Sequence, residues 1–215
     1  MTQILPYGRH YWKTVYQRPG DMDGISNYKE HCRYLKSIFD LENIEIESVV
    51  DLGCGFGHIL GELVRRFNPQ TMIAVEPCAF ALRQAKDRNS RYKEISFANK
   101  TIQQWCTAET KKKHTFDLGV CQSVLQYVST AELKWLIPIL AKKFRYLYLT
   151  VPTSHEYTLQ RVQEGFTDPF AYRRSKEAYR TLLKPHFTFV GSRLLESKTH
   201  NNLNTTLFKE ILFRH

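Results

Sequence analysis

Apolar residues fall into two patterns along the chain, short runs rich in β-branched and aromatic residues and longer stretches with helical spacing. The short runs predict strands, and the longer stretches, with apolar residues three and four positions apart, predict helices. The predicted strands cover residues 49–52, 72–76, 95–97, 116–121 and 146–151. Three predicted helices cover residues 59–67, 78–89 and 175–183. Three others are located less closely: one begins at Tyr28, a short one lies around Trp105, and one begins after Ser129. Five strands alternating with helices predict an α/β fold, with a mostly parallel sheet and helices on both faces.

Polar residues mark the starts of two of these helices. Ser129 and Glu132 form an S-x-x-E capping box, in which each side chain satisfies a backbone N–H of the first turn. Asn27 or Ser26 is placed to cap the first long helix. Pro138 lies inside the helix that follows Ser129, and we expect it to bend or shorten that helix.

Three parts of the chain follow no clear helical period. Residues 1–27 form an aromatic-rich arm with several glycines and prolines. Segment 153–173 contains a glycine and a proline, and predicts a substrate-covering loop with some helix. Two β-rich runs at 187–195 and 205–213, joined by HNNLN, predict an antiparallel pair at a sheet edge.

Size and composition predict a folded protein with one full core. The chain has 215 residues and 25.3 kDa, with 42% hydrophobic and 24% charged residues. No apolar run approaches the roughly 20 residues that span a bilayer, and the N-terminus lacks a basic region followed by an apolar one. We therefore expect a soluble, cytoplasmic protein with no membrane partner.

The chain is basic, with a formal net charge of +10 and a pI near 9.4. Residues 111–114 form one cluster, and Arg173, Arg174 and Lys176 form another. Such charge is compatible with nucleic acid or anionic lipid, with anionic small substrates or polysaccharide intermediates, and with an ordinary solvated surface. Charge alone does not choose among them.

The five cysteines are odd in number and far apart in sequence. They contain no C-x-x-C pair that would suggest zinc, and they do not predict a disulfide framework. We expect free, mostly buried thiols and no metal site.

Residues 49–57, VVDLGCGFG, carry the most informative chemistry. An apolar run typical of a buried strand ends in Asp51, and Gly53, Gly55 and Gly57 follow at alternate positions. Glycines there let the backbone turn tightly and approach a ligand without Cβ clashes. The sixth position from the first glycine is His58, so the spacing differs from the dinucleotide-binding turn. An acid at the strand end favours an ammonium or sulfonium ligand, although a glycine-rich surface turn is the alternative.

This turn resembles the first motif of the class I S-adenosylmethionine-dependent methyltransferases, Val-Leu-Asp-x-Gly-x-Gly-x-Gly. The resemblance spans roughly residues 45–215. It implies a Rossmann-like three-layer sandwich with a mostly parallel seven-stranded sheet whose last strand is antiparallel. It also implies S-adenosyl-L-methionine as cofactor, an N-terminal extension at 1–45 that covers the cofactor and substrate site, and a methyltransferase domain at 46–215.

The family pattern assigns further cofactor contacts. Glu76, an acid at the end of the second predicted strand, would accept hydrogen bonds from both ribose hydroxyls. Pro77 would flank the ribose and adenine by family position. Cys54 lies within the glycine turn itself.

The adenine end departs from the family pattern, which often places an Asp after the third strand. This chain has no acid there, so Thr101 is the expected hydrogen-bond acceptor and Ile102 the expected contact with the purine. Core packing explains Ile102 equally well. After the fourth strand, Cys121, Gln122 and Ser123 are the residues expected beside the methionine part of the cofactor.

The methyl acceptor leaves weaker signals. His155 follows the fifth strand, where open α/β sheets place ligand-facing groups, and is the candidate general base. An exposed loop histidine is the alternative. Tyr7, Tyr11 and Trp12 could cover the sulfonium or hold an aromatic acceptor, or they could pack under the first helix.

These residues predict a methyltransferase acting on an oxygen or nitrogen of a small metabolite, such as a sugar or natural-product intermediate. The Asn or Asp-Pro-Pro-Tyr box of enzymes that methylate exocyclic base nitrogens is absent from the sequence. An RNA methyltransferase that uses the basic surface is the alternative, and a cofactor-binding protein without turnover is a third. The chain is expected to be a monomer or homodimer.

Overall fold

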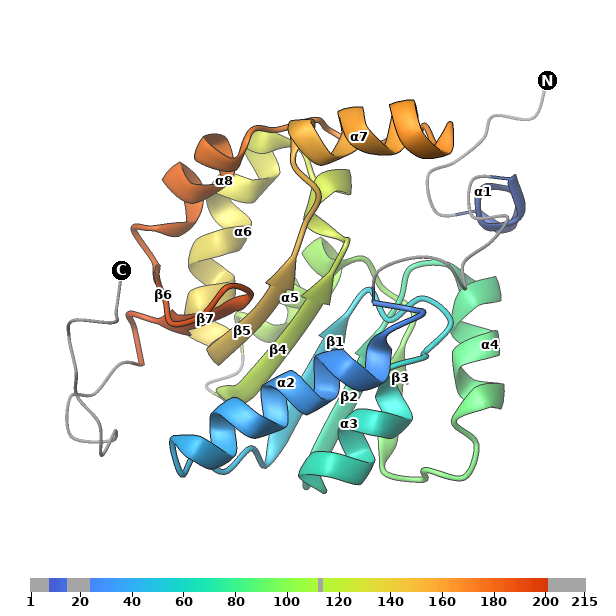
Figure 1. The fold of residues 1–215 in the computed structure, drawn as a ribbon. Coiled ribbons are helices and arrows are strands. Elements are labelled where there is room, and N and C mark those ends of the chain that lie inside the picture. The colour runs from blue at the N-terminus through green and yellow to red at the C-terminus, as the bar shows by residue number, and fades with distance from the viewer. Residues whose placement is uncertain (1–7, 15–23, 112–113, 201–215) are drawn as a thin grey trace.

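The computed structural model describes residues 8–14, 24–111 and 114–200 (Figure 1). Its centre is a seven-stranded sheet in the order β3-β2-β1-β4-β5-β7-β6. The strands are β1 (Ser48–Leu52), β2 (Thr71–Val75), β3 (Ile95–Ala98), β4 (Phe116–Gln122), β5 (Phe144–Thr150), β6 (Phe187–Phe189) and β7 (Leu194–Ser197). The first five are mutually parallel, and β7 runs antiparallel to both neighbours. The predicted Rossmann-like sheet with an antiparallel last strand is confirmed.

Helices cover both faces of this sheet, as Figure 1 shows. The helical elements are α1 (Arg9–Thr14), α2 (Tyr28–Leu41), α3 (Leu60–Phe67), α4 (Ala79–Arg88), α5 (Ile102–Glu109), the 3₁₀ turn η2 (Leu125–Tyr127), α6 (Thr130–Lys143), α7 (Ser154–Glu164) and α8 (Lys176–Leu183). Helices α2, α3 and α4 contribute to one buried apolar cluster, and α5, α6 and α8 to the other.

Side-chain alternation along the strands separates these two cores. Within β1, Val49 belongs to the cluster under α2 and α3, whereas Val50 belongs to the cluster under α5 and α6. All five residues of β1 are buried, as expected for a central parallel strand covered on both faces. The carboxyl ends of β1 to β5 therefore meet at one edge of the sheet, where ligands bind in open α/β folds.

Both helices begin where their capping residues predicted, but only one of the two predicted side-chain caps is formed. Ser129 and Glu132 form the expected reciprocal capping box before α6. Asn27 is the residue before α2, but its side chain accepts the Gly24 N–H at 2.7 Å instead of capping the helix. Helix α6 continues through Pro138 for 14 residues, so the predicted shortening is wrong.

Segment 153–173 contains a regular helix, α7, that the apolar pattern did not predict. Tyr157 is the one residue of this helix that the structure buries, so an apolar stripe is lacking. Thr153 and Glu156 form a capping box at its start, and Gly165 ends it in the left-handed conformation at φ 64°. The ends of this helix are therefore marked by its capping residues, although its sequence has no helical spacing of apolar residues.

The run 187–195 is a hairpin instead of one strand. Strands β6 and β7 pair antiparallel around a turn at residues 190–193, closed by the Gly191 N–H to the Leu194 carbonyl at 3.2 Å. The antiparallel pair at the sheet edge is present, but both of its strands come from the first β-rich region. The second predicted run, 205–213, lies outside the described residues. The division at residues 45 and 46 stays a prediction.

Candidate active site

The glycine turn lies at the carboxyl end of β1 and packs against its neighbours without room for side chains. Gly53 has φ +86°, and a Cβ there would lie 2.3 Å from Val124 Cγ2. Gly57 has φ +69°, and a Cβ there would lie 2.8 Å from both Ala85 Cβ and Asn89 Nδ2. Left-handed backbone and close packing both require glycine at these positions. The turn is fixed to β2 by the Gly53 and Cys54 N–H groups, which donate to the Val75 carbonyl at 2.8 and 2.9 Å.

Asp51 is a buried acid that faces this cavity with an unsatisfied oxygen. Its side chain is 2% exposed, and Oδ2 has no hydrogen-bond partner among the described residues. Burial, and then the nearby Glu76, raises the pKa of Asp51 to about 8. A buried carboxyl without a partner is costly to fold, so its presence beside a cavity points to a cationic ligand.

Glu76 is the second buried acid, one residue beyond β2. Its Oε1 accepts the Cys78 N–H at 2.9 Å, and its Oε2 accepts the Gly55 N–H at 3.0 Å. Burial raises the pKa of Glu76 to about 7, although these two hydrogen bonds favour the charged form. Glu76 thus connects the glycine turn to the start of α4 and offers carboxylate oxygens at the cavity wall.

Asn99 lies in the region after β3, where this chain lacks the acid of the family pattern. Its Nδ2 donates to the carbonyls of Glu76 and Pro77, both at 2.9 Å. Thr101 instead caps α5 in a reciprocal box with Gln104, and Ile102 is buried in the core under α5 and α6. The alternative explanation for Ile102, core packing, is what the structure displays.

The carboxyl end of β4 supplies the opposite wall. Ser123 has a left-handed backbone at φ 53°, uncommon for a residue with a side chain, and its N–H donates to the Thr150 carbonyl at 2.8 Å. Gln122 Nε2 lies 3.2 Å from Nδ1 of His31, a buried residue of α2 that also hydrogen-bonds the Tyr148 hydroxyl. Gln122 is therefore oriented from inside the protein.

Aromatic residues of the N-terminal segment cover the glycine turn. Trp12 lies against Phe56, with ring centroids 4.7 Å apart, and its ring is 3.1 Å from the position of a Cβ on Gly55. Tyr11 is buried, and its hydroxyl contacts Tyr127 and Asp168. Figure 1 shows α1 beside the start of α4, at the edge where the strands end.

One cavity brings most of the predicted site residues together. Its walls include ten of them: Tyr11, Trp12, Asp51, Gly53, Cys54, Gly55, Glu76, Pro77, Gln122 and Ser123. Gly57 packs beneath the turn, against α4.

Other predicted site residues lie elsewhere. His155 is exposed on the first turn of α7 and does not line this cavity. Cys121 points into the core, Thr101 caps α5, and Ile102 packs in the core, so none of the three lines the cavity. Tyr7 lies outside the described residues.

Sequence reasoning did not assign seven further wall residues to the site: Gly24, Ile25, Phe56, His58, Ile59, Val124 and Tyr127. Burial and the nearby Arg88 lower the pKa of His58, so this ring favours its neutral form. The hydrophobic residues among them could not be predicted from a motif, because many different side chains can make an apolar contact with a ligand. Tyr127, in the segment after β4, could have been found as an aromatic residue beside Gln122 and Ser123.

The cysteines lie in the interior of the protein. All five are free and buried, as predicted. Burial raises the thiol pKa of Cys54 at the cavity wall and of Cys121 in the core. A neutral thiol is a poor nucleophile, so Cys54 is not a candidate nucleophile at the cavity wall.

Comparison with known proteins finds a methyltransferase domain in this chain. Residues 49–143 match the family model described as Methyltransferase domain. The plantazolicin methyltransferase BamL, solved with a triazolic desmethylPZN analog and SAH, has a TM-score of 0.64 at 17% identity, over 80% of this chain and 66% of that chain. No curated protein sequence matches the chain.

Two further solved structures share the fold. An S-adenosylmethionine-dependent methyltransferase from Clostridium acetobutylicum has a TM-score of 0.61 at 16% identity, over 81% of this chain and 84% of that chain. The N-methyltransferase NodS from Bradyrhizobium japonicum has a TM-score of 0.56 at 14% identity, over 81% of this chain and 98% of that chain. Residues 49–143 therefore match a methyltransferase domain, and the chain shares the fold of solved S-adenosylmethionine-dependent methyltransferases.

The residues at the cavity fit that cofactor. The backbone of the glycine turn lines the cavity, and the buried Asp51 Oδ2 beside it has no hydrogen-bond partner among the described residues. Across the described ranges, no group of three or more His, Cys, Asp or Glu side chains is arranged to hold a metal ion. None of the helices seen in those ranges has the length and apolarity needed to cross a membrane.

Proposed function

We propose that this methyltransferase acts on an oxygen or nitrogen of a small metabolite of the sugar or natural-product type. The observation that carries the proposal is that residues of the N-terminal segment and of the glycine turn line one cavity. A covered cavity suits a small acceptor better than a polymer. The names of BamL and NodS, a plantazolicin methyltransferase and an N-methyltransferase, support the same range of acceptors.

We propose the following residues as those that hold the cofactor. The Asp51 carboxylate would face its cationic methionine part, and the Glu76 carboxylate would accept ribose hydroxyls. Pro77, held by the Asn99 amide, would flank the adenine side, and Asn99 is the nearest replacement for the missing acid. When bound, S-adenosylmethionine supplies a methyl group on a sulfonium, ready for in-line displacement.

The chain's own contribution to the reaction is to position the acceptor and exclude water. Tyr11, Trp12 and Phe56 form an apolar cover, and Gln122 and Tyr127 supply polar groups at the wall. Orientation of this kind can provide much of the rate enhancement without an obligatory base. His155 receives no role, because it is exposed on α7.

The proposed location and partners follow from the same features. Five buried free thiols support a cytoplasmic location, since reducing compartments keep thiols free. The proposed partner is the small-molecule acceptor, with the protein as a monomer or homodimer.

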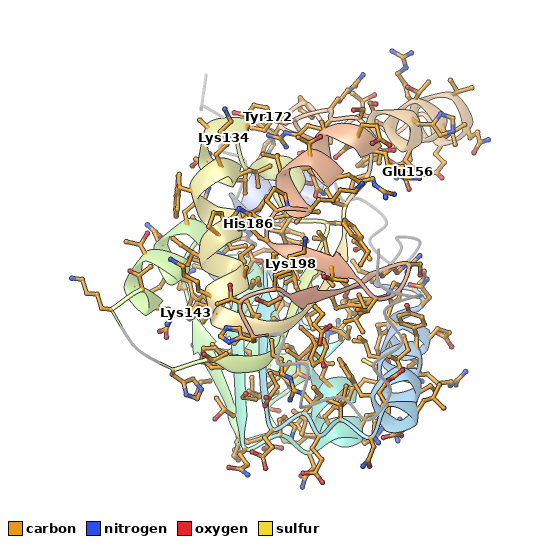
Figure 2. All side chains as sticks on the ribbon, turned by 90° about the vertical axis from the view of Figure 1, so that its left-hand side faces the viewer. Lys134, Lys143, Glu156, Tyr172, His186 and Lys198 are labelled. Carbon is orange, nitrogen blue, oxygen red and sulfur yellow. The ribbon has the colours of Figure 1, made fainter. Side chains whose placement is uncertain are left out.

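RNA is the second acceptor class to test, because basic side chains on the surface could bind its phosphates. Lys134, His186 and Lys198 lie on the side formed by α6, α8 and the β6–β7 hairpin (Figure 2). Figure 1 places α1 on the other side of the molecule, so these charges are remote from the cavity cover. This separation favours the small acceptor.

The test is a screen with methyl-labelled S-adenosylmethionine against amine and hydroxyl metabolites, with total RNA as a parallel acceptor. We expect label in a small product, and RNA binding weak enough to disappear at moderate salt. Label in RNA, with affinity that falls steeply with salt, would replace the small-metabolite proposal. Cofactor binding without label in either class would indicate a binding protein without turnover.

A further inference from the structure

Three oxygen atoms from distant segments meet at the covered end of the cavity. The Tyr11 hydroxyl comes from α1, the Tyr127 hydroxyl from η2, and the Asp168 carboxylate from the segment between α7 and α8. Each hydroxyl donates to Asp168 Oδ2 at 2.7 Å, and the two hydroxyl oxygens are 2.8 Å apart. The ring of Tyr11 also packs edge-on against Phe170, with centroids 5.5 Å apart.

The hydrogen bonds of this cluster use both oxygens of Asp168. Oδ2 receives the two tyrosine hydroxyl hydrogens, and Oδ1 receives the Phe170 N–H at 2.9 Å. Asp168 is only 3% exposed, so these bonds form away from water. Hydrogen bonds to a carboxylate are roughly twice as strong as neutral ones, and burial keeps water from competing for them.

Asp168 and Tyr127 belong to one firmly connected part of the protein. The Arg174 guanidinium, buried in the same segment as Asp168, donates to the Val128 carbonyl at 2.5 Å and to Thr130 Oγ1 at 3.0 Å. The Tyr172 N–H donates to the Gln126 carbonyl at 2.8 Å. The segment that carries Asp168 is thereby tied to η2 and to the residues that follow it.

Helix α1, in contrast, depends on tertiary contacts for its position. It has six residues, far fewer than the roughly 12 that an isolated helix needs to be even marginally stable in water. Tyr11 is its buried residue, at 3% exposure. The next residue, Trp12, lies on the glycine turn, so the position of α1 determines whether the turn is covered.

We propose that Asp168 is a positioning residue that holds α1 closed over the bound cofactor through the Tyr11 hydroxyl. Tyr127 forms the fixed side of this contact. Because Trp12 and the cofactor contact the same glycine turn, release of the cofactor requires α1 to leave Asp168. The inference rests on the cofactor and on no particular methyl acceptor.

The experiment measures association and dissociation rates of S-adenosylhomocysteine on the immobilised full chain by surface plasmon resonance. Tyr11→Phe and Asp168→Ala are each expected to raise the dissociation rate about tenfold, the effect of one charge-assisted hydrogen bond. The double variant should dissociate no faster than the faster single variant, because both changes break one contact. Asp168→Asn keeps the shape but replaces the charged acceptor of both tyrosine hydroxyls with a neutral amide, so it should also accelerate release.

Tyr172→Phe is the matched control, since Tyr172 lies in the same segment, 50% exposed on the outer surface (Figure 2). Its dissociation rate should equal that of the unmodified chain. Tyr11→Phe keeps the ring on a peripheral helix, and thermal melting verifies that the core is intact. Dissociation rates within about twofold of the unmodified chain for both Tyr11→Phe and Asp168→Ala would overturn the proposal. Failure of the unmodified chain to bind S-adenosylhomocysteine would instead contradict the cofactor assignment.

Discussion

At the residue scale, Asp51 lowers stability in order to offer a charge to a ligand. Its native pKa of about 8 is far above the unfolded value of 3.8, so the native state holds a proton that the unfolded state releases between these values. The free energy of unfolding therefore falls as pH rises from about 4 to about 8. Asp51→Asn removes this cost.

We predict that Asp51→Asn stabilises the ligand-free protein at pH 8, on the order of 1 to 3 kcal/mol, and has little effect at pH 4. Denaturant unfolding at the two pH values measures the difference. The same variant should bind S-adenosylmethionine more weakly, because the charge that faces the cation is gone. A variant that is no more stable at pH 8 than the unmodified chain would show that the burial of Asp51 carries no such cost.

The two buried acids also predict how cofactor affinity depends on pH. Glu76 and Asp51 have raised pKa values of about 7 and about 8, so both are largely protonated at pH 6 in the ligand-free protein. A cation and ribose hydroxyls favour the carboxylates, so binding should release protons. Affinity should rise between pH 6 and 7.5, by at most about tenfold per pH unit for each acid. Calorimetry in buffers of different ionisation enthalpy measures the released protons, and proton uptake would contradict this account.

At the element scale, the glycine turn is defined by both its backbone and its packing. Gly57→Ala must strain a left-handed backbone and also displace Ala85 or Asn89 of the α4 region. Gly165, which ends α7, is also left-handed, but nothing lies within 4 Å of a Cβ there. Gly165→Ala therefore isolates the strain without the clash.

We predict that Gly57→Ala lowers the free energy of unfolding by about 1 to 3 kcal/mol more than Gly165→Ala, the usual cost of overpacking. Urea unfolding of both variants measures this difference. Equal losses would mean that α4 moves away at no cost and that the turn is loosely packed.

Elements with a strong apolar period could be predicted from the sequence, and elements defined by polar ends could not. Buried strands such as β1 and β4 could be recognised in the sequence, because a strand covered on both faces consists mostly of apolar residues. Some helix was expected in segment 153–173, but the bounds of α7 were not predicted because its apolar stripe is absent, and its capping residues were the available signal. The β6–β7 hairpin was read as one strand, since its turn at 190–193 lies between apolar runs.

The same distinction applies to the site. Gly53 and Glu76 could be predicted because backbone turns and ribose contacts demand particular residue types at fixed spacing. Asp168 could not, because its contacts with Tyr11 and Tyr127 join segments that are 157 and 41 residues apart in the sequence. His155 was predicted from its place after β5, but α7 begins there and leaves the side chain exposed.

At the scale of the whole molecule, the fold brings the ends of β1, β2 and β4 to one edge and covers them with the N-terminal segment. Asp51, Glu76 and Gln122 come from these three places and line one cavity. The basic residues on the α6, α8 and hairpin side lie away from it (Figures 1 and 2). The basic residues of that side are therefore not part of the cavity.

The central claim is that this cavity binds S-adenosylmethionine through Glu76, and calorimetric titration of the cofactor tests it most directly. We predict that Glu76→Ala weakens binding by about 1.5 to 3 kcal/mol, or about 10- to 100-fold, the loss of a charged hydrogen-bond acceptor. Glu94→Ala, which removes an exposed acid before β3, serves as the matched control and should bind normally. Unchanged affinity in Glu76→Ala, with the protein folded, would contradict the account.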